Sequence, residues 1–472
     1  MFRKLNTLAV AVAIGLGSSV ALASETDRLM EILIAKGVLT AEEAAAIKAE
    51  AKEAETEEYT GVPDTYDETK PVGTQSVPMN VHHEKGYLNF ETADGNIKYW
   101  LDGRVMLDTG SISNSQDANK VYSETEFRRL RLAVKGIFYK DWEGELDIDF
   151  ADLDDGASFI EVKDAWMAYT GFNNTIIKLG NHKPFYSMDE VTTSRWVNLI
   201  ERSMVSDAFS PGRRIALSAS HFGESFVVGA TLFGDEYNVD NSGEGVNEKL
   251  GWAARGVYRP IVSDGGRNIL HLGLNLKNQP PMSDDGGRLR FRTRPEVRNF
   301  TVFGPDGDDG SRYLNTGRFD ADSYDSYGFE LAGKRGPFYA QAEYHVADVD
   351  VIGGPDAEFS GWYVNVAYFL SGGEREYSLF DGEFGKVYPT SNRGAWELVA
   401  RYSNLDLNDL SAGITGGSSD VITLGVNWYI NNNFIVRANY TMADNDIYAD
   451  GDGDFVGNDD VDAFGLRFHY MF

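Results

Sequence analysis

Cysteine, long apolar runs and an excess of basic charge are all missing from this chain of 472 residues. Without cysteine there can be no disulfide, no thiolate metal ligand and no cysteine nucleophile. No stretch after residue 23 approaches the roughly 18 apolar residues that a membrane-spanning helix needs. The 43 lysines and arginines are outnumbered by 73 aspartates and glutamates, which gives a formal net charge of -30. Nucleic-acid binding rests on clustered basic residues, so the composition argues against it.

The first 23 residues have the pattern of a signal peptide. Arg3 and Lys4 form a basic start, Leu8–Leu16 is an apolar run, and Ala21–Ala23 matches a small-x-small cleavage site. We therefore predict that residues 1–23 are a signal peptide and that the mature protein is exported.

Residues 24–59 are predicted to be a helical, coiled-coil-like segment. Apolar residues recur at helical spacing, and Thr40–Glu43 is a capping box for a helix rich in Ala, Glu and Lys. Two such short helices cannot form a core alone, so they either contact themselves, other subunits or the cell wall, or form a solvated spacer. Residues 60–96 contain three prolines and are predicted to be a linker.

From residue 97 onward, apolar and polar residues alternate in segments of about ten. For example, Leu272 and Leu274 alternate with His271 and Asn275, and this period of two is typical of half-buried strands. Tight turns alternate with longer acidic or glycine-rich loops, except that the connection 371–392 is long on the side of the short turns. We predict 16 strands, near residues 97–109, 124–139, 142–150, 158–170, 174–182, 212–222, 225–234, 249–259, 268–278, 324–335, 337–348, 358–370, 393–404, 420–430, 433–442 and 461–472.

The polar faces of these strands distinguish a membrane barrel from a soluble β protein. They carry Arg, Lys, Asp, Glu and His, and unpaired buried charge costs several kcal/mol per group, so the interior must be wet. We predict an all-β transmembrane barrel of 16 antiparallel strands over residues 97–472, preceded by a short helical periplasmic segment. Together with the signal peptide, the even strand number predicts the outer membrane of a Gram-negative cell, where the barrel would contact lipid and lipopolysaccharide.

Residues 183–214 do not alternate, although strands flank them. The segment is too long and too rich in aromatic and apolar residues for an ordinary polar loop, and long loops of this kind are usually functional. Strand parity puts it on the external side. We expect residues 183–211 to fold inside the barrel, with apolar residues such as Trp196 and Leu199 against the inner wall; the alternative is that these residues cover a trimer interface.

Four segments carry a resemblance to a known family: the two-helix start, GNHKPFYSMDEVTTSRWVNLIERS (180–203), FRTRPE (291–296) and SGGEREY (371–377). Together they resemble the porin O/P family, whose members include phosphate-selective and polyphosphate-selective outer-membrane porins. The resemblance covers nearly the whole mature chain. It implies a homotrimer of 16-stranded barrels through which small solutes, often anions, diffuse passively.

Basic side chains on the water-facing strand positions and in the central loop predict an anion pathway. Arginine and lysine replace part of the hydration shell of an anion, and the guanidinium fork suits oxyanions. The predicted constriction and anion path consists of Lys183, Arg195, Arg202, Arg213, Arg214, Arg129, Arg131, Lys135, Arg255 and Arg259. Further lumen basic residues are Arg104, Lys178, Arg401, Arg437 and Arg467.

No enzymatic motif, metal site or cofactor site is predicted. Glu145, Asp147 and Asp149 share one strand face, but a solvated inner wall explains them better than acid–base chemistry. The acidic run 450–454 lacks the closing glutamate of a calcium loop and is expected to be a surface loop, with loose cation bridging left open. Two alternatives to an anion pore remain: a weakly selective general channel, favoured by acidic lumen residues, and a barrel that tethers the envelope through its N-terminal helices.

Overall fold

The computed structural model describes residue 40 and residues 78–84, 87–113, 115–116, 121–151, 160–236, 249–282, 286–298, 300–302 and 312–472. The predicted signal peptide lies outside the described residues, as do the predicted helical segment, except for Thr40, and the first part of the predicted linker. In the part of the chain that is described, no helix is both long and apolar enough to cross a membrane.

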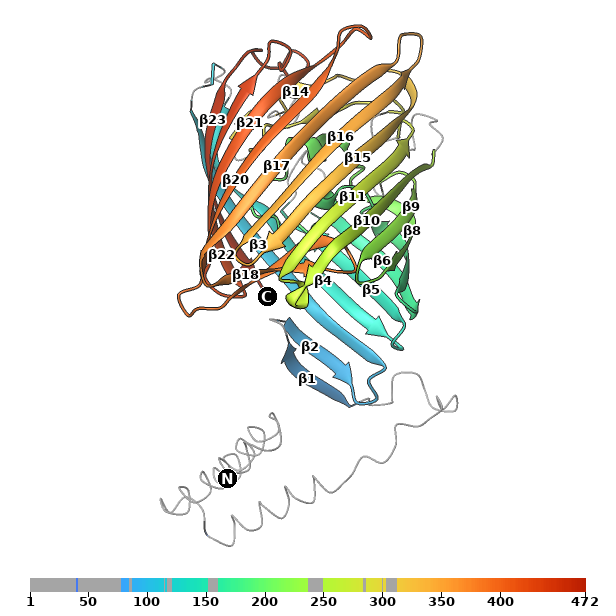
Figure 1. Ribbon diagram of the computed structural model, residues 1–472, viewed down its shortest axis with the longest axis vertical. Coiled ribbons are helices and arrows are strands. Elements are labelled where there is room, and N and C mark those ends of the chain that lie inside the picture. The colour runs from blue at the N-terminus through green and yellow to red at the C-terminus, as the bar shows by residue number, and fades with distance from the viewer. Residues whose placement is uncertain are drawn as a thin grey trace, which may run out of the picture. The chain divides into compact units, whose positions relative to one another are not determined.

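Sixteen antiparallel strands form a closed barrel (Figure 1). Each strand pairs with the next one in this series, and the last pairs with the first, through contacts such as Arg467 opposite Asp108. The prediction of a 16-stranded antiparallel barrel is thereby confirmed. The strands are β3 Ile97–Ser113, β4 Val121–Phe138, β5 Trp142–Asp149, β6 Glu161–Phe172, β7 Thr175–His182, β8 Arg214–Phe222, β9 Phe226–Phe233, β10 Gly251–Ser263, β11 Asn268–Gln279, β15 Ala321–Arg335, β16 Phe338–Val351, β17 Ala357–Ser371, β20 Ala395–Asp409, β21 Ile414–Tyr429, β22 Phe434–Asn445 and β23 Val461–Met471.

The two faces of the barrel wall are inverted relative to those of a soluble protein. On β8, Leu217 is 49% exposed on the outer face, whereas the neighbouring Ser218 is 1% exposed on the inner face. The pattern follows from the pleat, which turns successive side chains to opposite faces. An apolar exterior and a polar interior are the arrangement that a barrel in lipid requires.

The two ends of the barrel differ in the length of their connections. At the short-turn end, residues 139–141, 173–174 and 223–225 join neighbouring strands directly. The opposite, long-loop end carries the connections between β7 and β8 and between β11 and β15. Because short turns face the periplasm in barrels of this type, the long-loop end faces outward from the cell.

Part of the segment that we predicted as a linker is ordered into a hairpin. Strands β1 (Met79–Glu84) and β2 (Tyr87–Thr92) pair with each other, and β2 continues onto β3 through Phe90 opposite Tyr99. The hairpin projects from the short-turn end (Figure 1). Its strands are short and lack a long alternating pattern, so they could not be expected from the local sequence.

The remaining elements lie in the connections. The long connection 371–392 forms a hairpin of β18 (Gly373–Ser378) and β19 (Glu383–Pro389). Residues 288–298 do not add a seventeenth barrel strand; they contain β12 (Arg292–Thr293), which pairs with β14 (Leu314–Asn315). The short elements are α4 (Met188–Val191), α5 (Met204–Phe209), the 3-10 turn η2 (Asp264–Gly266) and β13 (Phe300–Val302), which pairs with β4.

Candidate functional site

The connection between β7 and β8, residues 183–213, crosses the interior of the barrel; we call it the central loop. Two short helices shape it. Ser187 caps α4 by accepting a hydrogen bond from the Glu190 amide, and Ser203 caps α5 by accepting one from the Ser206 amide. A serine at the N-cap satisfies an amide that would otherwise lack a partner.

Charged side chains of the barrel wall bind the backbone of the central loop. The amides of Met188 and Asp189 donate to the Glu343 carboxylate on β16, at 3.1 and 2.8 Å. On β23, Arg467 donates to the Ile200 carbonyl at 2.6 Å. Arg401 and Arg437 donate to the carbonyls of Glu201 and Arg195, both at 3.1 Å. The predicted lumen residues Arg401, Arg437 and Arg467 are therefore buried anchors of this loop.

Glycines in the wall make room for the apolar side chains of the central loop. A Cβ atom on Gly425 of β21 would lie 2.7 Å from Leu199 Cδ2, and one on Gly229 of β9 would lie 2.9 Å from Phe185 Cδ2. Such distances are shorter than van der Waals contact, so a larger residue at either position would force the Leu199 or Phe185 side chain to move. Leu199 is fully buried by this packing.

Two more segments enter the interior. Residues 288–298 carry Glu296, whose carboxylate accepts hydrogen bonds from Arg401 Nε at 2.7 Å and from the Met204 amide at 3.2 Å. The β18–β19 hairpin enters from the short-turn end: Arg375 donates to the Trp196 carbonyl at 2.5 Å and to the Tyr429 hydroxyl at 2.9 Å. Loops from both ends thus contact the central loop and narrow the lumen.

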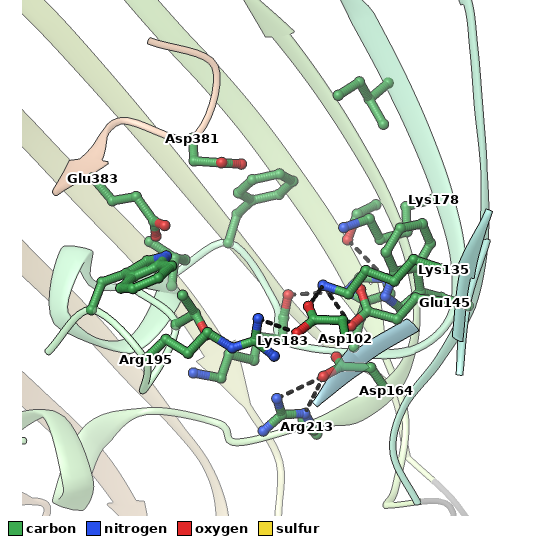
Figure 2. A pocket seen from close by; sticks show the side chains of 18 of the residues that line it. Asp102, Lys135, Glu145, Asp164, Lys178, Lys183, Arg195, Arg213, Asp381 and Glu383 are labelled. Atoms are coloured by element: carbon green, nitrogen blue, oxygen red, sulfur yellow. Dashed lines mark hydrogen bonds and ion pairs between the residues drawn. The ribbon is translucent and has the colours of Figure 1, made fainter. Parts of the chain in front are cut away.

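A cavity of about 390 Å³ remains between the central loop, the hairpin tip and the wall formed by β3 to β8 (Figure 2). We call it the lumen cavity. Both signs of charge face it. Its cationic side chains are Arg104, Lys135, Lys178, Lys183, Arg195 and Arg213, and its carboxylates are Asp102, Glu145, Asp164, Asp381 and Glu383.

Five of the six cations of the lumen cavity are held by carboxylates. Each ion pair holds the basic side chain in one position. Each pair also reduces the positive electrostatic field that a solute would meet. The pairs are Arg104–Asp147 (3.0 Å), Lys135–Glu145 (3.1 Å), Lys183–Glu190 (3.0 Å), Arg213–Asp164 (2.7 Å) and Arg195–Asp102.

Lys178 differs from the other five. Its ammonium lies 4.2 Å from the centroid of the Trp166 ring, a cation–π contact. Among the described residues it has no carboxylate within ion-pair distance. Its positive charge is therefore left for a solute in the cavity.

The protonation of Lys183, the lysine of the central loop, is strongly affected by its surroundings. Burial, reinforced by the nearby Arg202 guanidinium, lowers the pKa of Lys183 to about 7, while Glu190 opposes the shift. The ordinary lysine pKa is about 10.4. Lys183 therefore changes its charge near neutral pH.

The other predicted basic residues are distributed along the interior and not gathered at one ring. Most are engaged by neighbouring groups, whereas Arg129 contacts Met106 Sδ at 3.6 Å and has no carboxylate partner in the described part of the chain. The engaged residues and their partners are Arg131 with Asp149, Arg202 with the Asp189 carbonyl, Arg214 with the Pro211 carbonyl, Arg255 with Glu330, and Arg259 with the Gly223 and Glu224 carbonyls.

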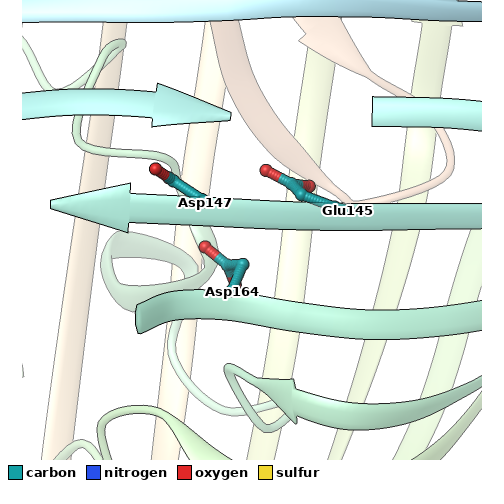
Figure 3. A group of neighbouring side chains, drawn as sticks. All are labelled: Glu145, Asp147 and Asp164. Atoms are coloured by element: carbon teal, nitrogen blue, oxygen red, sulfur yellow. The ribbon is translucent and has the colours of Figure 1, made fainter. Parts of the chain in front are cut away.

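Glu145, Asp147 and Asp164 form an acidic cluster on the wall (Figure 3). Each offers an oxygen within 4.8 Å of the others, a spacing suited to a cation. Lys135, Arg104 and Arg213 bind them, one cation for each carboxylate. The chain's own cations thus balance this cluster. Asp149, on the same strand face, binds Arg131.

Three side chains that hold the interior together were not predicted from the sequence: Arg128, Glu296 and Arg375. Arg128 is the extra residue of a β-bulge, so it and Arg129 both turn inward, and it binds Glu201 at 2.9 Å. The Arg-Arg pair within a strand was the available sign of a bulge. Glu296 lies in the FRTRPE motif, but nothing local shows that its partner is Arg401. Arg375 lies in SGGEREY, and its partners Trp196 and Tyr429 are 179 and 54 positions away in the sequence.

A closed 16-stranded barrel, apolar outside, polar inside and narrowed by inward loops, defines an outer-membrane porin. The model of the family described as phosphate-selective porin O and P matches residues 100–472. The chain belongs to this family, as its motifs indicated. It is 29% identical to Porin O of Pseudomonas aeruginosa over 419 residues, which cover 82% of this chain and 91% of that protein.

Solved structures share the fold. OmpT of Vibrio cholerae, in its trimer form, superposes with a TM-score of 0.50 at 12% identity, covering 80% of this chain and 99% of OmpT. OmpF of Salmonella typhi in complex with daunomycin gives a TM-score of 0.50 at 14% identity, covering 80% of this chain and 98% of OmpF. Family and fold indicate a channel in the Gram-negative outer membrane and not an enzyme.

Proposed function

We propose that this porin lets small solutes diffuse passively and favours inorganic anions, phosphate-like oxyanions among them. The observation that carries the proposal is the lumen cavity, where six basic side chains face the solute at the constriction and Lys178 lacks a carboxylate partner. The family description, phosphate-selective porin O and P, supports the same preference.

The ion pairs are compatible with conduction. A channel must bind its ion weakly and at several sites, because a strong single site would retain it. Carboxylates beside Arg104, Lys135 and Arg213 weaken the attraction for an anion and keep these side chains in place. Above the cavity, Arg131 and Arg129 on β4 extend the basic path toward the long-loop end.

The test is the reversal potential of the purified protein in planar bilayers across a salt gradient, with chloride, phosphate and sulfate compared. We expect anion selectivity, and a smaller anion preference in Lys178→Gln. The matched control is Lys140→Gln, because Lys140 is exposed in the 139–141 turn, outside the lumen cavity. Cation selectivity of the unaltered protein contradicts the proposal.

A weakly selective channel is the second candidate. Asp381 and Glu383 of the β18–β19 hairpin face the same cavity without an ion-pair partner among the described residues. In their ionised form, these two carboxylates offset part of the basic field. Equal permeability for potassium and chloride, unchanged in Lys178→Gln, would favour this candidate.

The homotrimer is also a proposal. It is supported by the trimer form of OmpT, which shares the fold. Chemical cross-linking in intact outer membranes tests it, and a product of three chains is expected. Cross-linked dimers alone, or monomers alone, would contradict it.

A further inference from the structure

Aromatic side chains form much of the wall of the lumen cavity. Trp166 on β6, Phe185 and Trp196 on the central loop, Tyr87 on β2 and Trp100 on β3 all line it. All five are half-buried and so keep part of their surface free. A phosphate ion gains little from such faces, whereas a flat organic group gains burial and ring stacking. The volume of about 390 Å³ lies within the range of small-molecule sites, roughly 300–1,000 Å³.

One basic and one acidic side chain in this cavity lack an ion-pair partner in the described part of the chain. Lys178 stands on β7, with its ammonium over Trp166. Glu383 opens β19; it is 8% exposed, lines the cavity and accepts no hydrogen bond from the described residues. Figure 2 shows Glu383 and Asp381 on one side of the cavity and Lys178 on another.

The surroundings of Asp381 and Glu383, the two carboxyl groups of the β18–β19 hairpin, indicate that they lack a cationic partner. Burial, together with the adjacent Asp381, raises the pKa of Glu383 well above its usual range, although the charges of Arg255, Lys183 and Arg202 oppose the shift. Burial likewise raises the pKa of Asp381, although Lys178 opposes that shift. A carboxylate in this state is stabilised in its charged form by an incoming cationic group.

We propose that the lumen cavity binds zwitterionic aromatic solutes of the amino-acid type. The solute carboxylate pairs with Lys178, its ammonium pairs with Glu383 and Asp381, and its ring packs against Trp166, Phe185 and Trp196. Binding of this kind goes beyond a preference for inorganic anions, because it needs one partner of each sign and an apolar wall. This proposal holds whether the salt-gradient measurement shows anion selectivity or not.

The experiment uses the full-length porin in planar bilayers and L-phenylalanine as the probe. We expect phenylalanine to reduce the single-channel current in a saturable manner. Lys178→Gln and Glu383→Gln should each raise the half-blocking concentration by about ten-fold, the effect of removing one charge-assisted hydrogen bond. The matched controls are Lys140→Gln in the 139–141 turn and Glu376→Gln on the exposed side of the hairpin, and both should block like the unaltered protein.

Three comparison solutes separate the components of the site. Benzoate lacks the ammonium, phenethylamine lacks the carboxylate and leucine lacks the ring, so each should block at least about ten-fold less well than phenylalanine. Equal block by benzoate overturns the role of Glu383, and equal block by leucine overturns the aromatic wall. The absence of block by phenylalanine overturns the proposal, whatever the ion selectivity proves to be.

Tryptophan fluorescence provides a readout that does not depend on conduction. Trp100, Trp166 and Trp196 face the cavity, so phenylalanine should change the emission with the same half-saturation as the current block. For a variant that does not conduct, the fluorescence titration decides. A titration that stays flat in the unaltered protein contradicts the proposal.

Discussion

The Glu296 carboxylate connects three parts of the interior: its own segment 288–298, the barrel wall and the central loop. It accepts hydrogen bonds from Arg401 on β20, from Ser403 Oγ at 2.5 Å and from the amide of Met204 at the start of α5. Thr423 on β21 adds a fourth, at 3.0 Å. One side chain of the external connection therefore joins the central loop to the wall.

Glu296→Ala should lower the free energy of unfolding by about 3–5 kcal/mol, because Arg401 is left buried without its carboxylate. Denaturant titration of the folded barrel, followed by tryptophan fluorescence, measures the change. Glu358→Ala, at an exposed position on β17, is the control and should cost less than about 0.5 kcal/mol. Equal stability of the two variants would show that Glu296 does not hold the interior together.

Lys183 should make ion selectivity depend on pH. With its pKa near 7, the side chain is charged below neutral pH and loses its charge as the pH rises. The anion preference, read from the reversal potential, should therefore be smaller at about pH 8 than at about pH 6. Lys183→Arg keeps the charge throughout this range and should remove the dependence. A pH dependence that persists in this variant assigns the titration to another group.

At the scale of elements, the docking of the central loop depends on shape as well as on charge. Gly425→Val should collide with Leu199, displace the loop and cost about 1–3 kcal/mol of stability. Single-channel conductance should rise as the constriction loosens. The control is Gly256→Val on β10, where an added Cβ has open space around it. Unchanged conductance in Gly425→Val would show that the central loop still narrows the pore when its contact with position 425 is altered.

The β18–β19 hairpin is the second element that narrows the pore. Replacing Gly373–Pro389 with an Asn-Gly turn should increase single-channel conductance, because the tip carrying Asp381 and Glu383 leaves the lumen. As a comparison, shortening the exposed connection 352–356, which lies at the long-loop end, should leave conductance unchanged. If the hairpin deletion conducts no better than the unaltered protein, the central loop alone sets the constriction.

The strands were predictable because the period of two depends on local sequence alone. All 16 segments coincide with barrel strands, with bounds that differ by up to six residues, as at β21, which begins at Ile414 and was predicted to begin at residue 420. The anchoring of the loop was not predictable, because its contacts join residues such as Arg467 and Ile200, 267 positions apart. Nor could the sequence show that most predicted cations are paired with carboxylates, since pairing depends on the register between strands.

At the scale of the whole molecule, the N-terminal segment and the barrel can be separated by experiment. Deleting residues 25–77 leaves β1, β2 and the lumen cavity in place, since the barrel and its hairpin form one compact unit from Pro78 to Phe472. Conductance should be unchanged. If the segment tethers the envelope, the same deletion should make cells leak periplasmic proteins, which enzyme assays of the culture medium detect. If the cells do not leak after the deletion, the N-terminal segment is better interpreted as a solvated spacer.

The seam between β23 and β3 has a consequence for how this porin is made. Arg467 on β23 binds Asp108 across the seam at 2.7 Å and also the Ile200 carbonyl of the central loop. Strand β23 thus makes its full set of side-chain bonds only when the central loop is in place. Pairing of the closing strands and packing of the loop are therefore coupled through the Arg467 side chain.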